Sequence, residues 1–466
     1  MTNPRAGRIE VLCGQALFLA AVADVGIREL YHRLWVEVRL MVFIFVAWLA
    51  WSLIMLALNR RAAKDGRPSA ALRFGFIVAG AGVIAVLAPN SWRDAGPLRW
   101  LGLLAILLGV TWLAAPVARS ALWNESWKRC CVALTAAVSL FVASQTVIGR
   151  WSAPHYEWLP GATPASTDQS RVITVILLMD ELNASSAPAL VKVLGNAGLR
   201  TQVQSVVPAG PHTAQAIPGM FTGHTLKDAK ACGSTSMCSM DGAIDFSKVT
   251  VTRPNVDFVG FFHPYCAIQG LRYCRRSVYA FPLTDWQRWK CLWSRQSKAM
   301  DRQELLACER LYIRSWVDLK EDVLKSLWQA PAWTHGGTIY AHLPMPHPPG
   351  RTPGAGLAQH YRENLDEVAV VLAEAARKAQ QAAPGHVRIV VVSDHPLRQS
   401  MWCETIFPYP QEGCMIEPSL EEESVPVIAA DSDNHFGSLQ DLHTNLQVFR
   451  WIATGSGAVN NLAQTR

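Results

Sequence analysis

Carboxylates and imidazoles stand in this sequence where apolar segments end, and residues of these types could hold a divalent metal. The residues concerned are Asp180, Glu181, His347, Asp394 and His395. Oxygen and nitrogen ligands without a thiolate suit Zn²⁺ or Mn²⁺. Each residue alone has a simpler interpretation, because an acid after a strand often caps a helix and a lone histidine is often structural. Their coincidence at three segment ends is what indicates a metal site.

Residues 212–223, HTAQAIPGMFTG, contain a candidate nucleophile. A hydroxyl bound to a metal loses its proton more readily and can attack phosphorus. Thr213 precedes an expected helix start, where free N–H groups favour an anion. An ordinary N-cap is the competing interpretation of Thr213, and both can hold. Three weaker candidates are more easily interpreted as caps or turn residues: Ser185, Ser186 and Thr222.

An α/β domain would bring these residues together. Apolar strands are expected at 172–179, 338–343 and 386–392, and helices at 186–197 and 361–383. Continuous apolar strands that alternate with helices are typical of a mostly parallel sheet covered on both faces. Sites in such sheets form beyond the carboxyl ends of the strands. The three strand ends should therefore lie side by side.

The composition points to a membrane part as well. Of the 466 residues, 50% are hydrophobic and 17% are charged, against about 25% charged in a typical soluble domain. Residues 1–150 carry a net charge of +9 and residues 151–466 a net charge of −2. Four apolar runs approach the roughly 20 residues that cross a bilayer: 36–58, 74–88, 100–117 and 130–148. A weaker run at 11–27 is expected to be a fifth span, with a signal peptide or an interfacial helix as alternatives.

Basic loops and cysteines predict which side of the membrane each part occupies. The loop 59–73 holds five Lys or Arg residues, which places it in the cytoplasm and residues 150–466 outside. Eight cysteines follow residue 150, and disulfides require an oxidising compartment. Sequence does not set their connectivity. The simplest pairing is local: 232–238, 266–274, 291–308 and 403–414.

These features predict three parts. Residues 1–150 form a helical transmembrane domain, residues 151–170 form a linker rich in Pro, Ala, Ser and Thr, and residues 171–466 form the catalytic domain. No Cys-x-x-Cys pair suggests a zinc ribbon. No Gly-rich phosphate loop or basic-aromatic patch suggests binding of nucleotides or nucleic acid.

Together these segments resemble the sulfatase-like branch of the alkaline phosphatase superfamily. The sequence is most similar to membrane-anchored phosphoethanolamine transferases, and next to phosphoglycerol transferases of the lipoteichoic-acid type. Four stretches carry the resemblance most sharply: VILLMDELNASS, TAQAIPGMFTG, HLPMPHPPG and IVVVSDH. The later ESVPVIAA resembles the strand that follows in these proteins. The resemblance implies an α/β domain of alkaline phosphatase type behind about five spans. It also implies a multi-pass protein of the bacterial inner membrane, with the catalytic domain in the periplasm.

The resemblance also implies roles for single residues. Glu181 would be an acidic metal ligand with Asp180 as neighbour or alternative, Thr213 the nucleophile and a metal contact, His347 a contact of the phosphoryl group or a second metal, and Asp394 and His395 metal ligands. The implied cofactor is a divalent metal, Zn²⁺ or else Mn²⁺. The implied reaction moves a phospho-head group, phosphoethanolamine or similar, from a membrane phospholipid to a lipid or glycan acceptor of the envelope through a phosphothreonine intermediate. Alternatives are a phosphatase or sulfuric-ester hydrolase that uses water, and a non-catalytic envelope-assembly protein.

The sequence departs from the family pattern in several places. Transferases continue S-D-H-G-E where this chain has SDHPLRQ, and FPYP stands where a further histidine is usual. These differences put a second metal site or donor contact in question. The formylglycine pattern C/S-x-P-x-R of arylsulfatases is absent. His212 is not part of the pattern and could be a general acid or a packing residue. His263 and Tyr265, in FFHPYCAIQGLRYC, could line a substrate pocket or support a disulfide loop.

Overall fold

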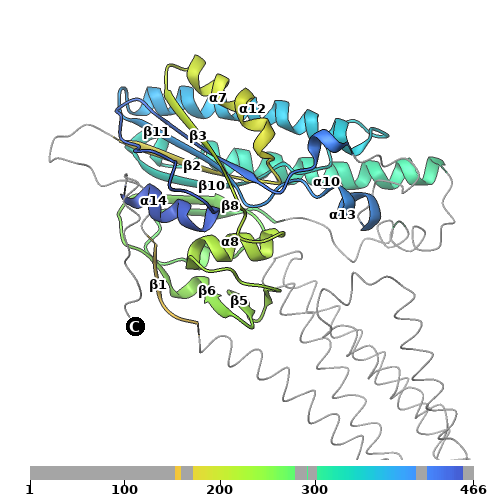
Figure 1. The fold of residues 1–466 in the computed structure, drawn as a ribbon, viewed down its shortest axis with the longest axis horizontal. Coiled ribbons are helices and arrows are strands. Elements are labelled where there is room, and N and C mark those ends of the chain that lie inside the picture. The colour runs from red at the N-terminus through yellow and green to blue at the C-terminus, as the bar shows by residue number, and fades with distance from the viewer. Residues whose placement is uncertain (1–152, 159–171, 279–290, 292–301, 406–416, 455–466) are drawn as a thin grey trace, which may run out of the picture. The chain divides into compact units, whose positions relative to one another are not determined.

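The computed structural model describes residues 153–158, 172–278, 291, 302–405 and 417–454 (Figure 1). Its strands are β1 (Tyr156–Trp158), β2 (Ile173–Asp180), β3 (Arg200–Val206), β4 (Lys230–Ala231), β5 (Ser236–Ser239), β6 (Gly242–Asp245), β7 (Val249–Val251), β8 (Val256–Gly260), β9 (Tyr273–Arg276), β10 (Gly337–Pro346), β11 (Val387–Ser393) and β12 (Val425–Asp431). Its α-helices are α7 (Ala187–Asn196), α8 (Thr213–Thr222), α10 (Arg302–Trp328), α11 (Ala332–His335), α12 (Leu357–Ala382), α13 (Gln399–Thr405) and α14 (Val448–Thr454).

The expected membrane spans at residues 11–148 lie outside the described residues. Among the helices that the structure does describe, none combines the length and the apolar character of a membrane span. Part of the expected linker is described: β1 pairs in parallel with β7, so that Tyr156 lies opposite Val249.

A seven-stranded sheet forms the centre of the described fold. Its strand order is β3-β12-β11-β2-β10-β8-β9. Strands β2, β8, β9, β10 and β11 pair in parallel, whereas β12 is antiparallel to both β11 and β3. The expected mostly parallel sheet is therefore confirmed, with one reversed strand. β2 lies between β10 and β11, and its Leu177 faces Ala341 on one side and Val391 on the other.

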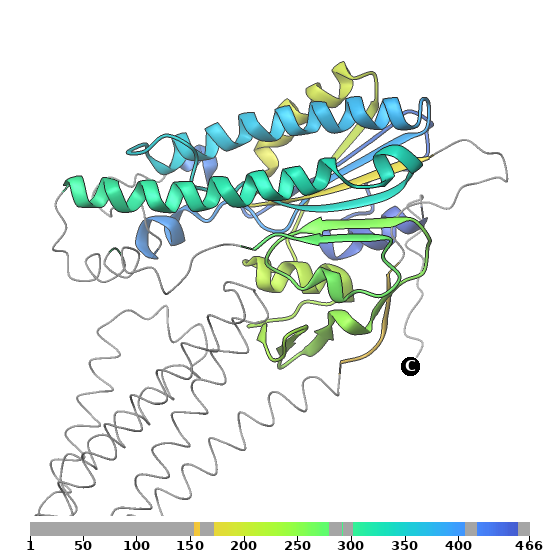
Figure 2. The same cartoon turned by 180° about the vertical axis from the view of Figure 1, so that it is seen from behind.

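Helices α7, α10 and α12 pack on one face of this sheet (Figure 2). Alternate residues of β2 point into that layer, among them Val175, Leu177 and Met179, all fully buried. On α12, Val368 and Leu372 are one turn apart and also fully buried. Burial of such a side chain contributes about 1.5–3 kcal/mol. This layer holds β2, the strand that ends in Asp180, in place.

Helices α8 and α14 cover the opposite face (Figure 1). An aromatic cluster joins them to the sheet. Phe221 of α8 lies 5.1 Å from Phe449 of α14 and 6.1 Å from Tyr340 of β10, measured between ring centroids. Tyr340 in turn lies 4.1 Å from Phe258 of β8. Since residues 215–221 are all buried, α8 is fixed tightly against this face.

The predicted strands and helices are present, with ends shifted by a few residues. The strand expected at 338–343 continues as β10 to Pro346, and the helix expected at 361–383 begins at Leu357 as α12. The stretch ESVPVIAA contains the start of β12, as the resemblance implies. Helix α10 and strands β8 and β9 were not predicted from the sequence. Short strands and a polar amphipathic helix leave only a weak pattern of apolar residues.

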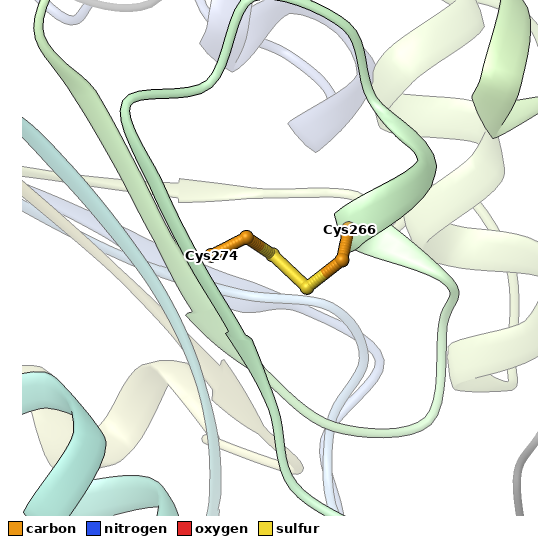
Figure 3. Close-up of a disulfide and its surroundings, with 2 residues drawn as sticks. All are labelled: Cys266 and Cys274. Carbon is orange, nitrogen blue, oxygen red and sulfur yellow. A yellow bond between two sulfur atoms is a disulfide. The ribbon is translucent and has the colours of Figure 1, made fainter.

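Disulfides confirm part of the expected pairing. Cys266 pairs with Cys274, and Cys291 pairs with Cys308. The first bond links the short 3₁₀-helix at residues 265–267 to β9 (Figure 3). Cys232, Cys238 and Cys403 are also disulfide-bonded. The pairs 232–238 and 403–414 stay predictions.

Candidate active site

The carboxyl ends of three adjacent strands meet at one edge of the sheet. Asp180 is the last residue of β2, Asp394 directly follows β11, and His347 directly follows β10. A register shift in β10 brings Pro346 opposite Asp180, and the backbone N–H of Asp394 donates to the carbonyl of Met179. The arrangement expected from the three strand ends is thus the one that the structure has.

Three side chains at this edge could hold a metal ion. Ligand atoms of Asp180, Asp394 and His395 all lie within 4.8 Å of one another, and all three residues are buried. Ligand atoms that share one Zn²⁺ at about 2.0–2.2 Å lie at most about 4.4 Å apart. Small side-chain movements would therefore close the group around an ion.

The hydrogen bonds of this group also fit a cation. Nδ1 of His395 lies 3.0 Å from the carbonyl of Pro396, so that Nδ1–H is the donor and Nε2 carries the lone pair. Nε2 lies 3.4 Å from Oδ2 of Asp394, a buried oxygen that accepts no hydrogen bond from the residues that the structure describes. Facing lone pairs repel, and a positive ion between them would remove the repulsion.

The pKa shifts of these three residues also indicate a site for a cation. Burial, followed by the charges of Asp394 and Glu181, raises the pKa of Asp180 well above its usual range. Burial likewise raises the pKa of Asp394 to about 7. Burial and then the positive charge of Arg398 hold the pKa of His395 well below its usual value. A metal ion would stabilise two buried carboxylates that are otherwise costly to ionise.

Thr213 lies directly beside this group. Its Oγ1 is 3.4 Å from Oδ1 of Asp180 and 3.2 Å from Nε2 of His395. It is the first residue of α8, and His212 occupies the N-cap position. The capping interpretation of Thr213 is therefore wrong. The Thr213 side chain is half-buried, whereas Asp180, Asp394 and His395 are buried.

Asn445 connects the nucleophile segment to the strand end. Its Nδ2 donates to the carbonyls of Ser393 and Asp394 at 3.0 and 2.9 Å, and its Oδ1 accepts from the N–H of Ala209 at 2.6 Å. The residue is fully buried. One side chain thus sets the distance between the loop before α8 and the loop after β11.

The carboxylate of Glu181 is not among the three grouped ligands. Its Oε1 accepts from Nη2 of Arg398 at 3.0 Å, and its Oε2 accepts from Nε1 of Trp402 at 2.8 Å. Its backbone has a φ of 65°, in the left-handed region. Such a conformation costs about 1 kcal/mol or more and persists where surrounding contacts impose it. Here the hydroxyl of Tyr361 donates to the Glu181 carbonyl at 3.0 Å.

His347 lies at the rim of the site, held by aromatic rings and one amide. It stacks on Trp316 at 4.4 Å and meets Trp402 edge-on at 4.9 Å, between ring centroids. Nδ2 of Asn364 donates to the His347 carbonyl at 2.8 Å. Burial lowers the pKa of His347 to about 4, so its imidazole is neutral at neutral pH.

His263 and Tyr265 pack beneath the site. Nε2 of His263 lies 3.2 Å from the carbonyl of Thr213, and the hydroxyl of Tyr265 lies 3.0 Å from Nδ1 of His342. Both residues are fully buried. These contacts connect the start of the disulfide loop to α8 and β10, and the full burial of both side chains places them in the interior. His212 contacts Nη1 of Arg398 through Nδ1.

Sequence reasoning did not single out Arg398, Trp402 or Asn364. A signal for Arg398 was present, because it falls in the stretch SDHPLRQ that departs from the family pattern. Trp402 and Asn364 lie inside helices α13 and α12, where helical periodicity is the dominant pattern. Neither residue could be separated from ordinary core positions.

No protein-family model matches the sequence, and no curated protein does. Solved structures do match. Lipooligosaccharide phosphoethanolamine transferase A, an integral membrane protein of Neisseria meningitidis, shares 13% identity over 83% of this chain and 76% of that chain, with a TM-score of 0.38. The soluble domain of that transferase shares 13% identity over 64% of this chain and 93% of its own, with a TM-score of 0.33.

A protein of the alkaline phosphatase superfamily from Vibrio parahaemolyticus shares 11% identity over 64% of this chain and 68% of that chain, with a TM-score of 0.31. Roles of the site residues rest on the geometry described above.

Proposed function

We propose that this protein is a membrane-anchored metalloenzyme that transfers a phospho-head group from a phospholipid to an envelope acceptor. The observation that carries the proposal is the position of Thr213. Its hydroxyl lies within hydrogen-bonding distance of Asp180 and His395, at the start of a helix and beside a buried group suited to a metal. A nucleophile so placed fits attack on phosphorus.

Asp180, Asp394 and His395 would hold the ion, either Zn²⁺ or Mn²⁺. When bound, a divalent ion lowers the pKa of a coordinated hydroxyl and withdraws charge from phosphoryl oxygens. The chain itself orients Thr213 through the contacts of His263 and Asn445. His347 would contact the phosphoryl group from the rim; since its Nδ1 donates to the carbonyl of Pro348, it could donate to a nonbridging oxygen through Nε2 only in its protonated form.

The transfer has two steps. In the first, Oγ1 of Thr213 bonds to phosphorus, the bond from phosphorus to the diacylglycerol oxygen breaks, and that oxygen gains the proton that Thr213 loses. In the second, an acceptor hydroxyl bonds to phosphorus, the bond to Thr213 breaks, and the threonine regains a proton. The disulfides, together with the five spans expected from sequence, suit a catalytic domain on the outer side of a bacterial inner membrane.

Mass spectrometry of the full chain after incubation with phosphatidylethanolamine tests this proposal. We expect an adduct on Thr213 with the mass of a phosphoethanolamine group, absent from Thr213→Ala. With phosphatidylglycerol supplied instead, a glycerophosphate mass would indicate a different head group. Release of free phosphoethanolamine to water, with no transfer to an envelope acceptor, would favour the hydrolase. A metal-free protein without an adduct would contradict the proposal and favour a non-catalytic role.

A further inference from the structure

Arg398 brings a guanidinium into the acidic site. It lies four residues beyond Asp394, and its Nε and Nη2 are 3.3 and 3.0 Å from Oε1 of Glu181. Its Nη1 contacts His212, the residue before Thr213. The Arg398 side chain is 19% exposed, whereas that of Glu181 is fully buried. The guanidinium is therefore partly accessible, and through His212 it adjoins the nucleophile segment, whose Thr213 is half-buried.

The ion pair orients the guanidinium. Glu181 occupies the edge formed by Nε and Nη2, and Trp402 holds the other oxygen of Glu181. Nη1 is left on the side of the nucleophile segment. An arginine fixed in this way presents planar donors without a large loss of side-chain entropy, which suits the oxygens of a phosphoryl group.

A charge count gives the class of substrate. Arg398 neutralises Glu181, and one divalent ion would neutralise Asp180 and Asp394. The site would then carry no net charge before substrate binds. A phosphodiester adds one negative charge in such a site, whereas a phosphomonoester adds up to two, and each unbalanced charge in a poorly solvated site is costly.

We propose that Arg398 binds the nonbridging oxygens of the phosphoryl group in place of a second metal ion, so that the site works with one divalent metal and takes monoanionic phosphodiesters. This inference rests on the proposed function. It assigns Arg398 a contact with substrate and assigns Glu181 the positioning of Arg398.

The test uses the full chain in detergent, saturated with Zn²⁺ or Mn²⁺. The double variant Arg398→Met/Glu181→Gln removes the cation together with its partner, so that no buried charge is left unpaired. The matched control is Arg272→Met/Asp257→Asn. In that ion pair the arginine is 22% exposed and the acid fully buried, and Asp257 lies near the start of β8, away from the strand ends of the site.

Three quantities are measured for each protein. They are the metal content by elemental analysis, the affinity for inorganic phosphate by calorimetry, and kcat/KM for bis(p-nitrophenyl) phosphate and p-nitrophenyl phosphate. For the unaltered chain we expect one metal per chain and faster turnover of the diester. For Arg398→Met/Glu181→Gln we expect unchanged metal content, with phosphate affinity and diester kcat/KM both lowered roughly 10- to 100-fold. The control should keep all three values.

Several results would overturn the inference. They are two metals per chain, preference for the monoester, unchanged phosphate affinity in the double variant, loss of metal from the double variant, or an equal loss of activity in the control. Failure of the proposed function is distinguishable, because it would appear as an unaltered chain that binds no metal and turns over neither ester. Phosphate affinity would still test Arg398 in an inactive protein.

Discussion

Oγ1 of Thr213 lies 3.2 Å from Nε2 of His395, although the two residues are 182 positions apart in the chain. The contact joins a helix on one face of the sheet to a strand end. We expect Thr213→Ala to lower turnover by on the order of 10³-fold or more, because the attacking atom is removed. Thr213→Ser keeps a hydroxyl and should retain measurable activity. Circular dichroism and metal content should be unchanged in both, and full activity of Thr213→Ala would refute the assignment.

Metal binding should stabilise the fold. Zn²⁺ at about 100 times its Kd would raise the free energy of unfolding by about 2.7 kcal/mol if it binds the folded state alone. Asp394→Asn should abolish this shift, as measured by thermal melting with and without ion. Asp257→Asn is a control at another fully buried acid, and it should keep the shift.

The variant Glu181→Gln distinguishes two roles of Glu181, either as the partner of Arg398 and Trp402 or as a metal ligand. Since the Glu181 carboxylate is held by Arg398 and Trp402, we expect this variant to keep the metal-dependent shift in melting temperature. A shift lost to the same extent as in Asp394→Asn would instead make Glu181 a ligand, as the family resemblance implies.

Asn364 should act on catalysis through His347. Its Nδ2 donates to the carbonyls of His347 and Pro349 at 2.8 and 3.0 Å, and its Oδ1 accepts from the buried Lys320 at 2.8 Å. We expect Asn364→Ala to lower kcat about tenfold, because loss of these bonds lets the loop move. In the His347→Ala background the same change should have little further effect on kcat. Additive losses would show that Asn364 acts elsewhere.

The ion pair between Lys320 and Glu367 predicts a pH dependence of stability. Burial alone would raise the pKa of Glu367, but the charge and hydrogen bond of Lys320, 2.7 Å away, hold it below its usual value. The stabilisation is therefore fully present above the ordinary pKa of about 4.3 and is lost as pH falls through the lower folded value.

Glu367→Gln should destabilise the protein by about 3 kcal/mol at pH 7, because it leaves the buried Lys320 without its charged partner. Denaturant unfolding should show that this difference shrinks below about pH 4. Glu374→Gln, on the exposed side of the same helix α12, is the control and should change little. A difference that is constant with pH would contradict the ion-pair explanation.

The Cys266–Cys274 disulfide should affect activity as well as stability. It closes a loop with a sequence separation of 8, for which loop-closure entropy predicts about 2.5 kcal/mol. His263, three residues before Cys266, contacts the Thr213 carbonyl, so Cys266→Ala/Cys274→Ala should also lower kcat. Cys291→Ala/Cys308→Ala removes a comparable bond, with a sequence separation of 17. This variant should lower stability but leave kcat unchanged. Equal effects on kcat would argue against a role of the first bond at Thr213.

Much of the sheet could be predicted because its central strands are mostly apolar. Short apolar runs such as 172–179 and 386–392 are typical of strands buried on both faces, and the carboxyl ends of parallel strands share one edge, so the acids after them were expected to lie there. Strand β8 was harder to predict, since Asp257 interrupts its apolar run. The charge of Asp257 is neutralised by Arg272, which comes from a later segment. Such compensation depends on tertiary contacts and leaves no local pattern.

The residues of the site could be predicted from the sequence, but the role of each residue could not. Asp180 and Glu181 are adjacent in sequence, but Asp180 ends β2 and Glu181 turns away with a φ of 65°, so that their side chains have different partners. The pairing of Glu181 with Arg398 spans 217 positions. Spacing along the chain therefore predicts that both acids are near the site, but three-dimensional packing decides which one faces the imidazole.

The position of α8 has a consequence for folding. The nucleophile enters from the layer that α8 and α14 form with the sheet, whereas the acids belong to the sheet itself and are anchored from the other layer by α12 and α7. A chain that has formed the sheet and one helical layer would already hold its acids in place, yet would have no reactive hydroxyl beside them. Activity would then appear only once α8 has docked, so the gain of turnover during refolding would report the time of that docking.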